Sequence, residues 1–404
     1  MGVRIAPVYA EQSLAILFID LDGFKGINDT LGHEVGDRVL SMAALRVKNF
    51  STDSQLVCRW GGDEFLVVLS HEGHQQTSTF AKGLIEKMSE PYVDGTYRVT
   101  IGATIGISIY PEHSQSKEEL IQHADMAMYQ QKRQAKGSVG YFNETLRLQL
   151  QREFNLRDQL ITAAEKDELN LVYQPIVNAK TGKVEAFEAL LRWNSALGLI
   201  MPDQFIAIAG QYGQIKNIGL WVLERACQQA KVFQQRSPEI AICVNVSVVQ
   251  FQDEDFIEQI SNVFQKHDFE PSGLHIEITE SFFASDKLGL MKQIKALQEM
   301  DIQISIDDFG TGYSSLSSMQ DMGVDIVKID KSFVDTIQGS GLSIITAVLH
   351  IANELNYQVV AEGVETEEQA KILRDLNVDY LQGYYFSRPM ESEQALEYLE
   401  SQAS

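Results

Sequence analysis

The chain has 404 residues, and 33 Lys and Arg oppose 56 Asp and Glu, which gives a formal net charge of -23. An acidic surface repels phosphates and therefore argues against binding to nucleic acid polymers or anionic membrane surfaces. No apolar stretch approaches the ~20 residues that span a bilayer. The three cysteines are Cys58, Cys227 and Cys243, and their spacing is not that of metal ligands. We therefore predict free thiols in a cytoplasmic protein.

The first third of the chain mixes strand and helix patterns. An apolar run at residues 14–19 ends in Asp20-Leu21-Asp22, and a helical stretch follows at 37–50. The segment CRWGGDEFLVVL predicts a hairpin around Gly61-Gly62. A second strand pair is expected between 97–99 and 104–109, followed by a helix over 117–136. This mixture predicts an α+β domain, which we place at residues 1–145.

Three blocks of this domain resemble the GGDEF family of diguanylate cyclases, which join two GTP molecules into cyclic di-GMP. They are DLDGFKGINDTLGHEVGD at 20–37, RWGGDEF at 59–65 and ADMAMYQQK at 124–132. The resemblance implies that Mg²⁺ binds to Asp20, Asp63 and the Leu21 carbonyl with help from Glu64. It also implies that Asn28 and Asp37 contact guanine and that Lys132 and Lys136 contact phosphates.

The domain departs from the family pattern in three places. The family's DxLTGLxNR segment and the helix ahead of the first strand are missing from Met1 to Ser13. Thr52 and Gln55 replace the Arg-x-x-Asp of the inhibitory product site, and Ala135-Lys136-Gly137 stands where Gly, Arg and Asn are usual. We therefore expect this domain to bind GTP, to make little or no cyclic di-GMP, and to regulate the rest of the chain.

Residues 143–169 predict a connecting helix. Leu146, Leu150 and Phe154 recur every four residues, and Leu160 follows on a sequence rich in helix-forming residues. The helix could act as a lever between two domains, or it could be the leading helix of the second domain, which we place at residues 146–404.

Eight short apolar segments between Leu171 and Phe386 alternate with helix-period stretches, which predicts a parallel (β/α)8 barrel. Each segment has a polar residue of catalytic type at or near its C-terminal end, where such barrels place their active sites. One polar residue at a strand end means little, but one on each of eight successive segments indicates a site. The residues are Gln174, Glu188, Asn245, Glu277 with Glu280, Asp307 with Asp308, Lys328, Glu362 with Glu365, and Gln382.

Carboxylates dominate the chemistry of this set, and the expected metal ligands are carboxylates and one amide oxygen, with one ammonium beside them. Oxygen donors suit Mg²⁺ or Mn²⁺, and two ions bridged by one aspartate commonly cleave phosphate esters. The residues alone therefore predict a metal-dependent phosphodiesterase.

The same region resembles the EAL family, the phosphodiesterases that hydrolyse cyclic di-GMP to the linear dinucleotide pGpG. The resemblance runs from about Gln151 onward and rests on eight ordered blocks: EALLRW at 188–193, YQPI at 173–176, NVS at 245–247, EITES at 277–281, DDFGTGYSSL at 307–316, KID at 328–330, AEGVET at 361–366 and QGYYFSRP at 382–389.

Position by position, the resemblance implies two divalent cations. One would be bound by Glu188, Asn245, Glu277 and Asp307, and the other by Asp307, Asp308 and Glu362. Lys328 would position or deprotonate the attacking water, and Gln174 and Arg192 would hold the dinucleotide. Glu280 would brace the loop at 308–315, while Glu365 and Gln382 would support the metals and the water.

The expected protein is thus a cytoplasmic GGDEF-EAL signalling enzyme that pairs as a homodimer, with a possible sensor domain upstream. Two alternatives remain from the sequence. One is a bifunctional cyclase and phosphodiesterase, and the other is a receptor that binds cyclic di-GMP without cleaving it.

Overall fold

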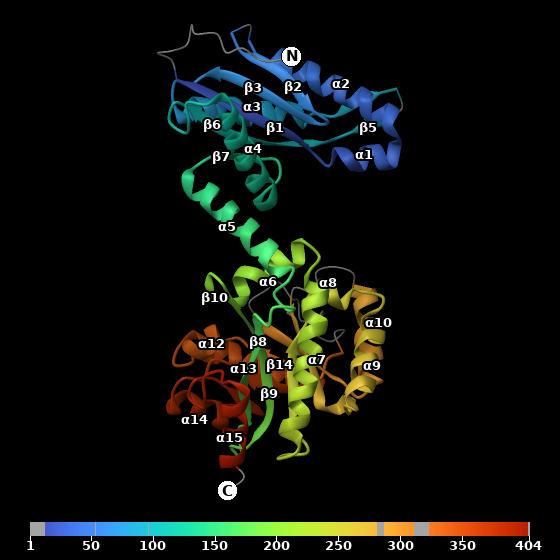
Figure 1. Cartoon of the computed structure of the whole chain (residues 1–404), viewed down its shortest axis with the longest axis vertical. Helices are drawn as coiled ribbons and strands as arrows, with labels where there is room; N and C mark the ends of the chain where they lie inside the picture. The colour runs from blue at the N-terminus through green and yellow to red at the C-terminus, as the bar shows by residue number, and fades with distance from the viewer. Residues whose placement is uncertain (1–12, 53, 96, 281–286, 311–322, 403–404) are drawn as a thin grey trace. The chain divides into compact units, whose positions relative to one another are not determined.

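A computed structural model describes residues 13–52, 54–95, 97–280, 287–310 and 323–402 of the chain (Figure 1). The chain divides into two compact units, residues 1–154 and 155–404. Each unit is described here by itself. The predicted functional boundary between residues 145 and 146 stays a prediction.

The first unit is built on a five-stranded sheet in the order β2-β3-β1-β6-β7. Its elements are β1 (Leu14–Asp22), α1 (Phe24–Leu31), α2 (His33–Phe50), β2 (Leu56–Gly61), β3 (Glu64–Ser70), α3 (His74–Met88), β4 (Tyr92–Asp94), β5 (Tyr97–Val99), β6 (Gly102–Tyr110), α4 (Lys117–Gln134) and β7 (Val139–Tyr141).

Alternation along β1 covers both faces of this sheet. Ala15, Leu17 and Ile19 belong to the core formed with α2 and α3, whereas Ile16 and Phe18 pack with α4. The start of α4 follows from its sequence, because the Ser116 side chain accepts a hydrogen bond from the backbone N–H of Glu119. The predicted α+β domain and its GGDEF hairpin, β2 with β3, are confirmed.

One predicted pairing in this unit is wrong. β5 pairs with β4 rather than with β6, while β6 pairs with β1 and β7. The physical reason is local, since Asp94-Gly95 is a strong hairpin signal and Gly95 has a φ of +58° that glycine adopts without strain.

The predicted connecting helix exists as α5 (Glu144–Leu160). Leu146 packs with Ala127 and Phe142 of the first unit. Further along the same helix, Leu156 and Leu160 belong to the core of the second unit. The second half of the helix is thus part of the barrel core, and the reading of the helix as a lever stays a prediction.

The second unit is an eight-stranded barrel of β8, β9 and β11 to β16, with the short strand β10 added beside β9. Its elements are β8 (Leu169–Asn178), β9 (Val184–Ser195), β10 (Gly198–Ile200), α6 (Pro202–Gln211), α7 (Ile215–Gln234), β11 (Ala241–Asn245), α8 (Val248–Phe251), α9 (Phe256–His267), η2 (Pro271–Gly273), β12 (Leu274–Thr279), α10 (Lys287–Gln298), β13 (Gln303–Phe309), β14 (Ile326–Ile329), α12 (Lys331–Asp335), α13 (Ser340–Leu355), β15 (Gln358–Ala361), α14 (Glu367–Asp375), β16 (Tyr380–Gln382) and α15 (Ser392–Gln402).

The barrel is confirmed, but the expectation that all of its strands are parallel is wrong for the first one. β8 is antiparallel to both β9 and β16. Only five residues separate β8 from β9, and a parallel connection needs a dozen or more. Asn178 starts the tight turn by accepting the backbone N–H groups of Lys180 and Thr181 through its side-chain oxygen.

Strand alternation sorts the barrel side chains into an outer and an inner set. On β12, Leu274, Ile276 and Ile278 belong to the large apolar core beneath the helices. The intervening His275 and Glu277 therefore face the barrel interior. The same alternation on the other strands positions the candidate site.

Candidate active site

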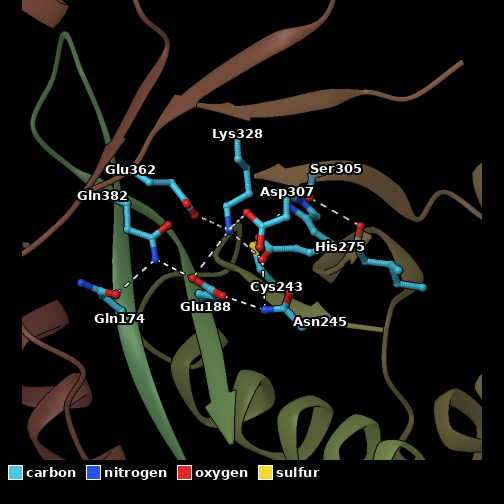
Figure 2. A network of polar contacts seen from close by, with 12 residues as sticks. Gln174, Glu188, Cys243, Asn245, His275, Ser305, Asp307, Lys328, Glu362 and Gln382 are labelled. Carbon is cyan, nitrogen blue, oxygen red and sulfur yellow. Dashed lines mark hydrogen bonds and ion pairs between the residues drawn. The ribbon is translucent and has the colours of Figure 1, made fainter. Parts of the chain in front are cut away.

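Each of the eight barrel strands contributes one polar side chain to a single interior layer. Figure 2 shows carboxylates of this layer, among them Glu188 and Glu362, joined to the ammonium of Lys328, while the amide side chains lie around Glu188. The layer consists of Gln174, Glu188, Asn245, Glu277, Asp307, Lys328, Glu362 and Gln382. The predicted pattern of one functional residue per strand thus corresponds to one layer of side chains inside the barrel, which we call the functional layer.

Lys328 is the only cation of this layer and is 1% exposed. Its Nζ lies 2.8 Å from Glu277 Oε2 and 2.6 Å from Glu362 Oε1. Asp307 Oδ1 is 3.4 Å from the same nitrogen, and Glu188 Oε2 is 3.7 Å away. One ammonium thus faces four carboxylates.

This imbalance shifts the proton affinities of the layer. Burial opposes the charged form of Lys328, but the surrounding carboxylates outweigh it and raise the pKa of the ammonium well above its usual range. Burial raises the pKa of Glu362 to about 8, even though Lys328 lowers it. Burial also favours a higher pKa at Glu188, yet Lys328 and hydrogen bonds from Gln382 and Asn245 keep that pKa below the usual value.

Amide side chains orient the Glu188 carboxylate. Asn245 Nδ2 donates to Glu188 Oε1 at 2.7 Å, and Gln382 Nε2 donates to Glu188 Oε2 at 2.6 Å. Gln174 lies at the edge of this group and donates to the backbone carbonyl of Ser387 at 3.1 Å. The two oxygens of Glu188 are therefore fixed in direction before any ligand binds.

The residues present fit divalent cations. Ligand oxygens of Asp307, Asp308 and Glu362 lie within 4.8 Å of one another. Asp307 Oδ1 is buried and has no hydrogen-bond partner among the described residues. Burial also raises the pKa of Asp308, and the neighbouring charge of Asp307 adds to that shift. Carboxylate oxygens that outnumber the neighbouring ammonium in a low-dielectric pocket are the donors that Mg²⁺ and Mn²⁺ prefer.

The remaining predicted residues lie around this layer. Glu280 Oε2 accepts the backbone N–H of Gly310 at 3.0 Å, so Glu280 holds the start of the predicted loop at 308–315, whose later part is outside the described residues. Arg192 lies four residues after Glu188 on β9 and donates to the Leu191 carbonyl at 2.8 Å. Glu365 is not drawn into the layer, because its carboxylate pairs with Lys331.

A second set of interior residues was not predicted from the sequence. These side chains lie two residues below the functional layer on every strand: Ile176, Ala186, Cys243, His275, Ser305, Ile326, Val360 and Tyr380. These residues could have been predicted from strand alternation, since they face the barrel interior as the functional residues do.

The first unit brings its predicted metal residues together. Asp20 on β1 is in register with Glu64 on β3, and the Leu21 N–H donates to the Asp63 carbonyl at 3.4 Å. Lys132 of α4 forms an ion pair with Asp20. Burial raises the pKa of Asp20, while Lys132 opposes the shift.

The predicted guanine contacts come from α1 and α2. The Asn28 side chain lies so close to Gly36 that a Cβ at Gly36 would stand 1.8 Å from its Oδ1. Asp37 follows Gly36 directly. Because Gly36 has no side chain, the Asn28 side chain can occupy the space beside it.

Comparison with known proteins agrees with this geometry. Residues 156–389 match the model of the family described as EAL domain. The chain belongs to the EAL domain family. Residues 3–138 match the family described as Diguanylate cyclase, GGDEF domain. The predicted tandem of the two families is confirmed.

Several bacterial relatives match the chain over most of its length. The chain is 37% identical over 390 residues to the bifunctional diguanylate cyclase/cyclic di-GMP phosphodiesterase MucR of Pseudomonas aeruginosa, covering 96% of this chain and 57% of that protein. It is 36% identical to the signaling protein YkoW of Bacillus subtilis, covering 96% of this chain and 49% of that protein. The chain therefore spans about half the length of these relatives.

Solved structures resemble the barrel unit. The MucR phosphodiesterase in complex with cyclic di-GMP has a TM-score of 0.58 and 38% identity, covering 60% of this chain and 99% of that one. An EAL domain protein from Listeria monocytogenes has a TM-score of 0.54 and 30% identity, covering 60% of this chain and 97% of that one. Across the described residues, no helix is both long and apolar enough to cross a membrane.

Proposed function

We propose that the barrel of this EAL protein hydrolyses cyclic di-GMP to pGpG with the help of two divalent cations. The carrying observation is the interior layer in which four carboxylates surround one buried ammonium. An anionic substrate would be repelled from such a layer unless cations balanced it. The family membership and the cyclic di-GMP in the MucR complex support the choice of substrate.

Two sets of side chains would hold the cations. The first is Glu188, Asn245, Glu277 and Asp307, and the second is Asp307, Asp308 and Glu362. Bound there, the cations would supply an activated water and neutralise the charge that grows on the phosphate oxygens. Mg²⁺ and Mn²⁺ both suit the oxygen donors.

Lys328 would act as a proton-holding and positioning group in this proposal. Without cations, the surrounding carboxylates raise the pKa of Lys328, so its nitrogen is an ammonium that donates hydrogen bonds. Its contacts hold Glu277 and Glu362 in place, and a donor in this position can orient the attacking water. Gln174 and Arg192 would contact the dinucleotide, and Gln382 would keep Glu188 aligned.

The direct test incubates the purified chain with cyclic di-GMP and Mg²⁺ or Mn²⁺ and separates the nucleotides by chromatography. Accumulation of pGpG that is lost in Glu188→Ala supports the proposal. Glu224→Ala is the matched control, because this half-buried carboxylate pairs with Lys266 on the outer helices, away from the interior layer. Tight binding of cyclic di-GMP without cleavage would instead support a receptor and contradict the proposal.

We further propose that the first unit binds GTP with Mg²⁺ and regulates the barrel while making little cyclic di-GMP itself. The carboxylates of Asp20 and Glu64 are adjacent, and Lys132 occupies the position next to them. Burial raises the pKa of Glu64, and the charges of Asp125 and Asp20 add to this shift, which again indicates a place for a cation.

The regulatory proposal is tested in two steps. Calorimetry should detect GTP binding that is weakened in Asp63→Ala, and GTP should change the rate of pGpG formation. In a Glu188→Ala background, GTP alone should yield little cyclic di-GMP. Substantial product there would favour the bifunctional alternative. The predicted homodimer and cytoplasmic location stay predictions.

A further inference from the structure

A cavity of about 250 Å³ lies inside the barrel beneath the functional layer. Its upper wall includes Glu277 and Lys328, and its lower wall includes Glu185 and Glu239 near the N-terminal ends of the strands. The cavity therefore approaches the catalytic residues from the side opposite to the one where the substrate would bind.

The cavity exists because the second interior layer is poorly filled. Barrel interiors are usually packed with bulky branched side chains. Here all eight second-layer positions line the cavity, and Ala186, Cys243 and Ser305 are small. The space is polar as well as open, because His275, Ser305 and Tyr380 also face it.

Two of these second-layer residues have metal-ligand geometry. Cys243 on β11 and His275 on β12 are in register, and Cys243 Sγ lies 3.8 Å from His275 Nδ1. A tetrahedral zinc ion with usual bond lengths would hold sulfur and nitrogen about 3.5 Å apart. The pair is therefore within a few tenths of an ångström of the separation that one such ion requires. Figure 2 shows both side chains beside the functional layer.

The charge of the lining favours a cation. Three carboxylates, Glu185, Glu239 and Glu277, line the cavity together with one ammonium, Lys328. Among the described residues, the Cys243 thiol is the only hydrogen-bond partner recorded for His275.

We propose that Cys243 and His275 form an inhibitory site for a thiophilic divalent cation of the zinc class. The cation would replace the thiol proton of Cys243, which passes to solvent, and would bind Sγ and Nδ1. Water in the cavity would complete the coordination. No such ion is needed by the hydrolytic reaction, whose proposed metal ligands are all oxygen atoms.

Inhibition would follow from the position of Glu277. This carboxylate is two residues from His275 on the same face of β12, and it contacts Lys328 directly. A cation below the layer would attract Glu277 downward and away from its role in the layer above. This consequence rests on the proposed phosphodiesterase function, whereas the metal binding does not.

Cobalt is the probe for the binding itself, because a thiolate-to-cobalt charge-transfer band reports sulfur ligation. The full chain, freed of metals and supplied with Mg²⁺ to occupy the oxygen ligands, is titrated with Co²⁺. We expect a band that disappears in Cys243→Ser, weakens about tenfold in apparent affinity in His275→Gln, and persists in Cys58→Ser and Cys227→Ser. A band that is absent from the wild type or unchanged in Cys243→Ser overturns the proposal.

Zinc inhibition of pGpG formation is the functional readout. Cys243→Ser should raise the Zn²⁺ concentration for half inhibition about tenfold. Equal sensitivity of wild type and Cys243→Ser would place the inhibition in the carboxylate layer and overturn the inhibitory role. If the chain cleaves no cyclic di-GMP at all, the hydrolytic function fails, while the cobalt titration still decides the metal site.

Discussion

Replacing Lys328 by Met should destabilise the metal-free barrel strongly. The substitution keeps a long unbranched side chain but removes the only cation among four carboxylates. Breaking a buried ion pair from one side typically costs about 3–5 kcal/mol. Glu362, with a pKa of about 8, can take up a proton at neutral pH and relieve part of that cost. We therefore expect a loss of about 3 kcal/mol, at the lower end of this range.

Lys331→Met is the matched control. Lys331 is three residues along the chain and also forms an ion pair, with Glu365, but its side chain is 48% exposed. Exposed pairs contribute about 0–1 kcal/mol. Both variants replace a lysine by methionine at neighbouring positions, so the difference between their losses in unfolding free energy reports the effect of burial.

The assay is urea unfolding of the full chain in EDTA, followed by tryptophan fluorescence in a Trp60→Phe background. Trp60 is the tryptophan of the first unit, so the signal then comes from Trp193 and Trp221 of the barrel. A loss below about 1 kcal/mol in Lys328→Met, or similar losses in both variants, would refute the reasoning.

Three further predictions concern pH, coupling and packing. Burial raises the pKa of Glu362 from 4.5 to about 8, so protonated Glu362 stabilises the metal-free barrel fully below about pH 4.5. This contribution of up to about 5 kcal/mol is lost as the pH rises to 8, and a urea midpoint in EDTA that stays constant over this pH range would contradict the prediction. Arg133 pairs with Glu153 of α5 at 2.8 Å and should transmit the GTP response, so Arg133→Ala should still bind GTP but lose the effect of GTP on pGpG formation. The control Arg147→Ala, which breaks a pair within α5, should keep that effect, and an unchanged response in Arg133→Ala would exclude the Arg133–Glu153 contact as the route. Gly106→Ala would place a Cβ 2.0 Å from a backbone carbonyl oxygen of α4 and should lower the stability of the first unit by about 1–3 kcal/mol or more, measured by hydrogen exchange. The control Gly26→Ala has open space around the new Cβ and should change stability little, and equal protection from exchange in both variants would show that α4 can shift.

The functional layer could be predicted from the sequence because a barrel turns a linear pattern into a spatial one. Residues such as Glu188, Asn245 and Lys328 each follow or end an apolar strand, and parallel strands deliver their ends to one rim. The central position of Lys328 could not be predicted, because it depends on the lengths and rotamers of the side chains around it.

The errors came from local signals that competed with the global pattern. The short turn after Asn178 forces β8 to be antiparallel, and Asp94-Gly95 pairs β5 with β4. Glu365 pairs with Lys331 in the metal-free barrel, and its supporting role at the metals stays a prediction. The second interior layer was missed because its members include alanine, isoleucine and valine, which do not attract notice in a search for chemistry.

The antiparallel strand β8 also dictates when the barrel can be completed during synthesis. β8 pairs with β16, so Ile176 must wait for Gln382, more than two hundred residues later, before the cylinder closes. The five-stranded sheet of the first unit is complete once Tyr141 has been made. A nascent chain emerging from the ribosome should therefore hold a finished first unit beside an open, unclosed barrel, exposed to chaperones until its last strand arrives.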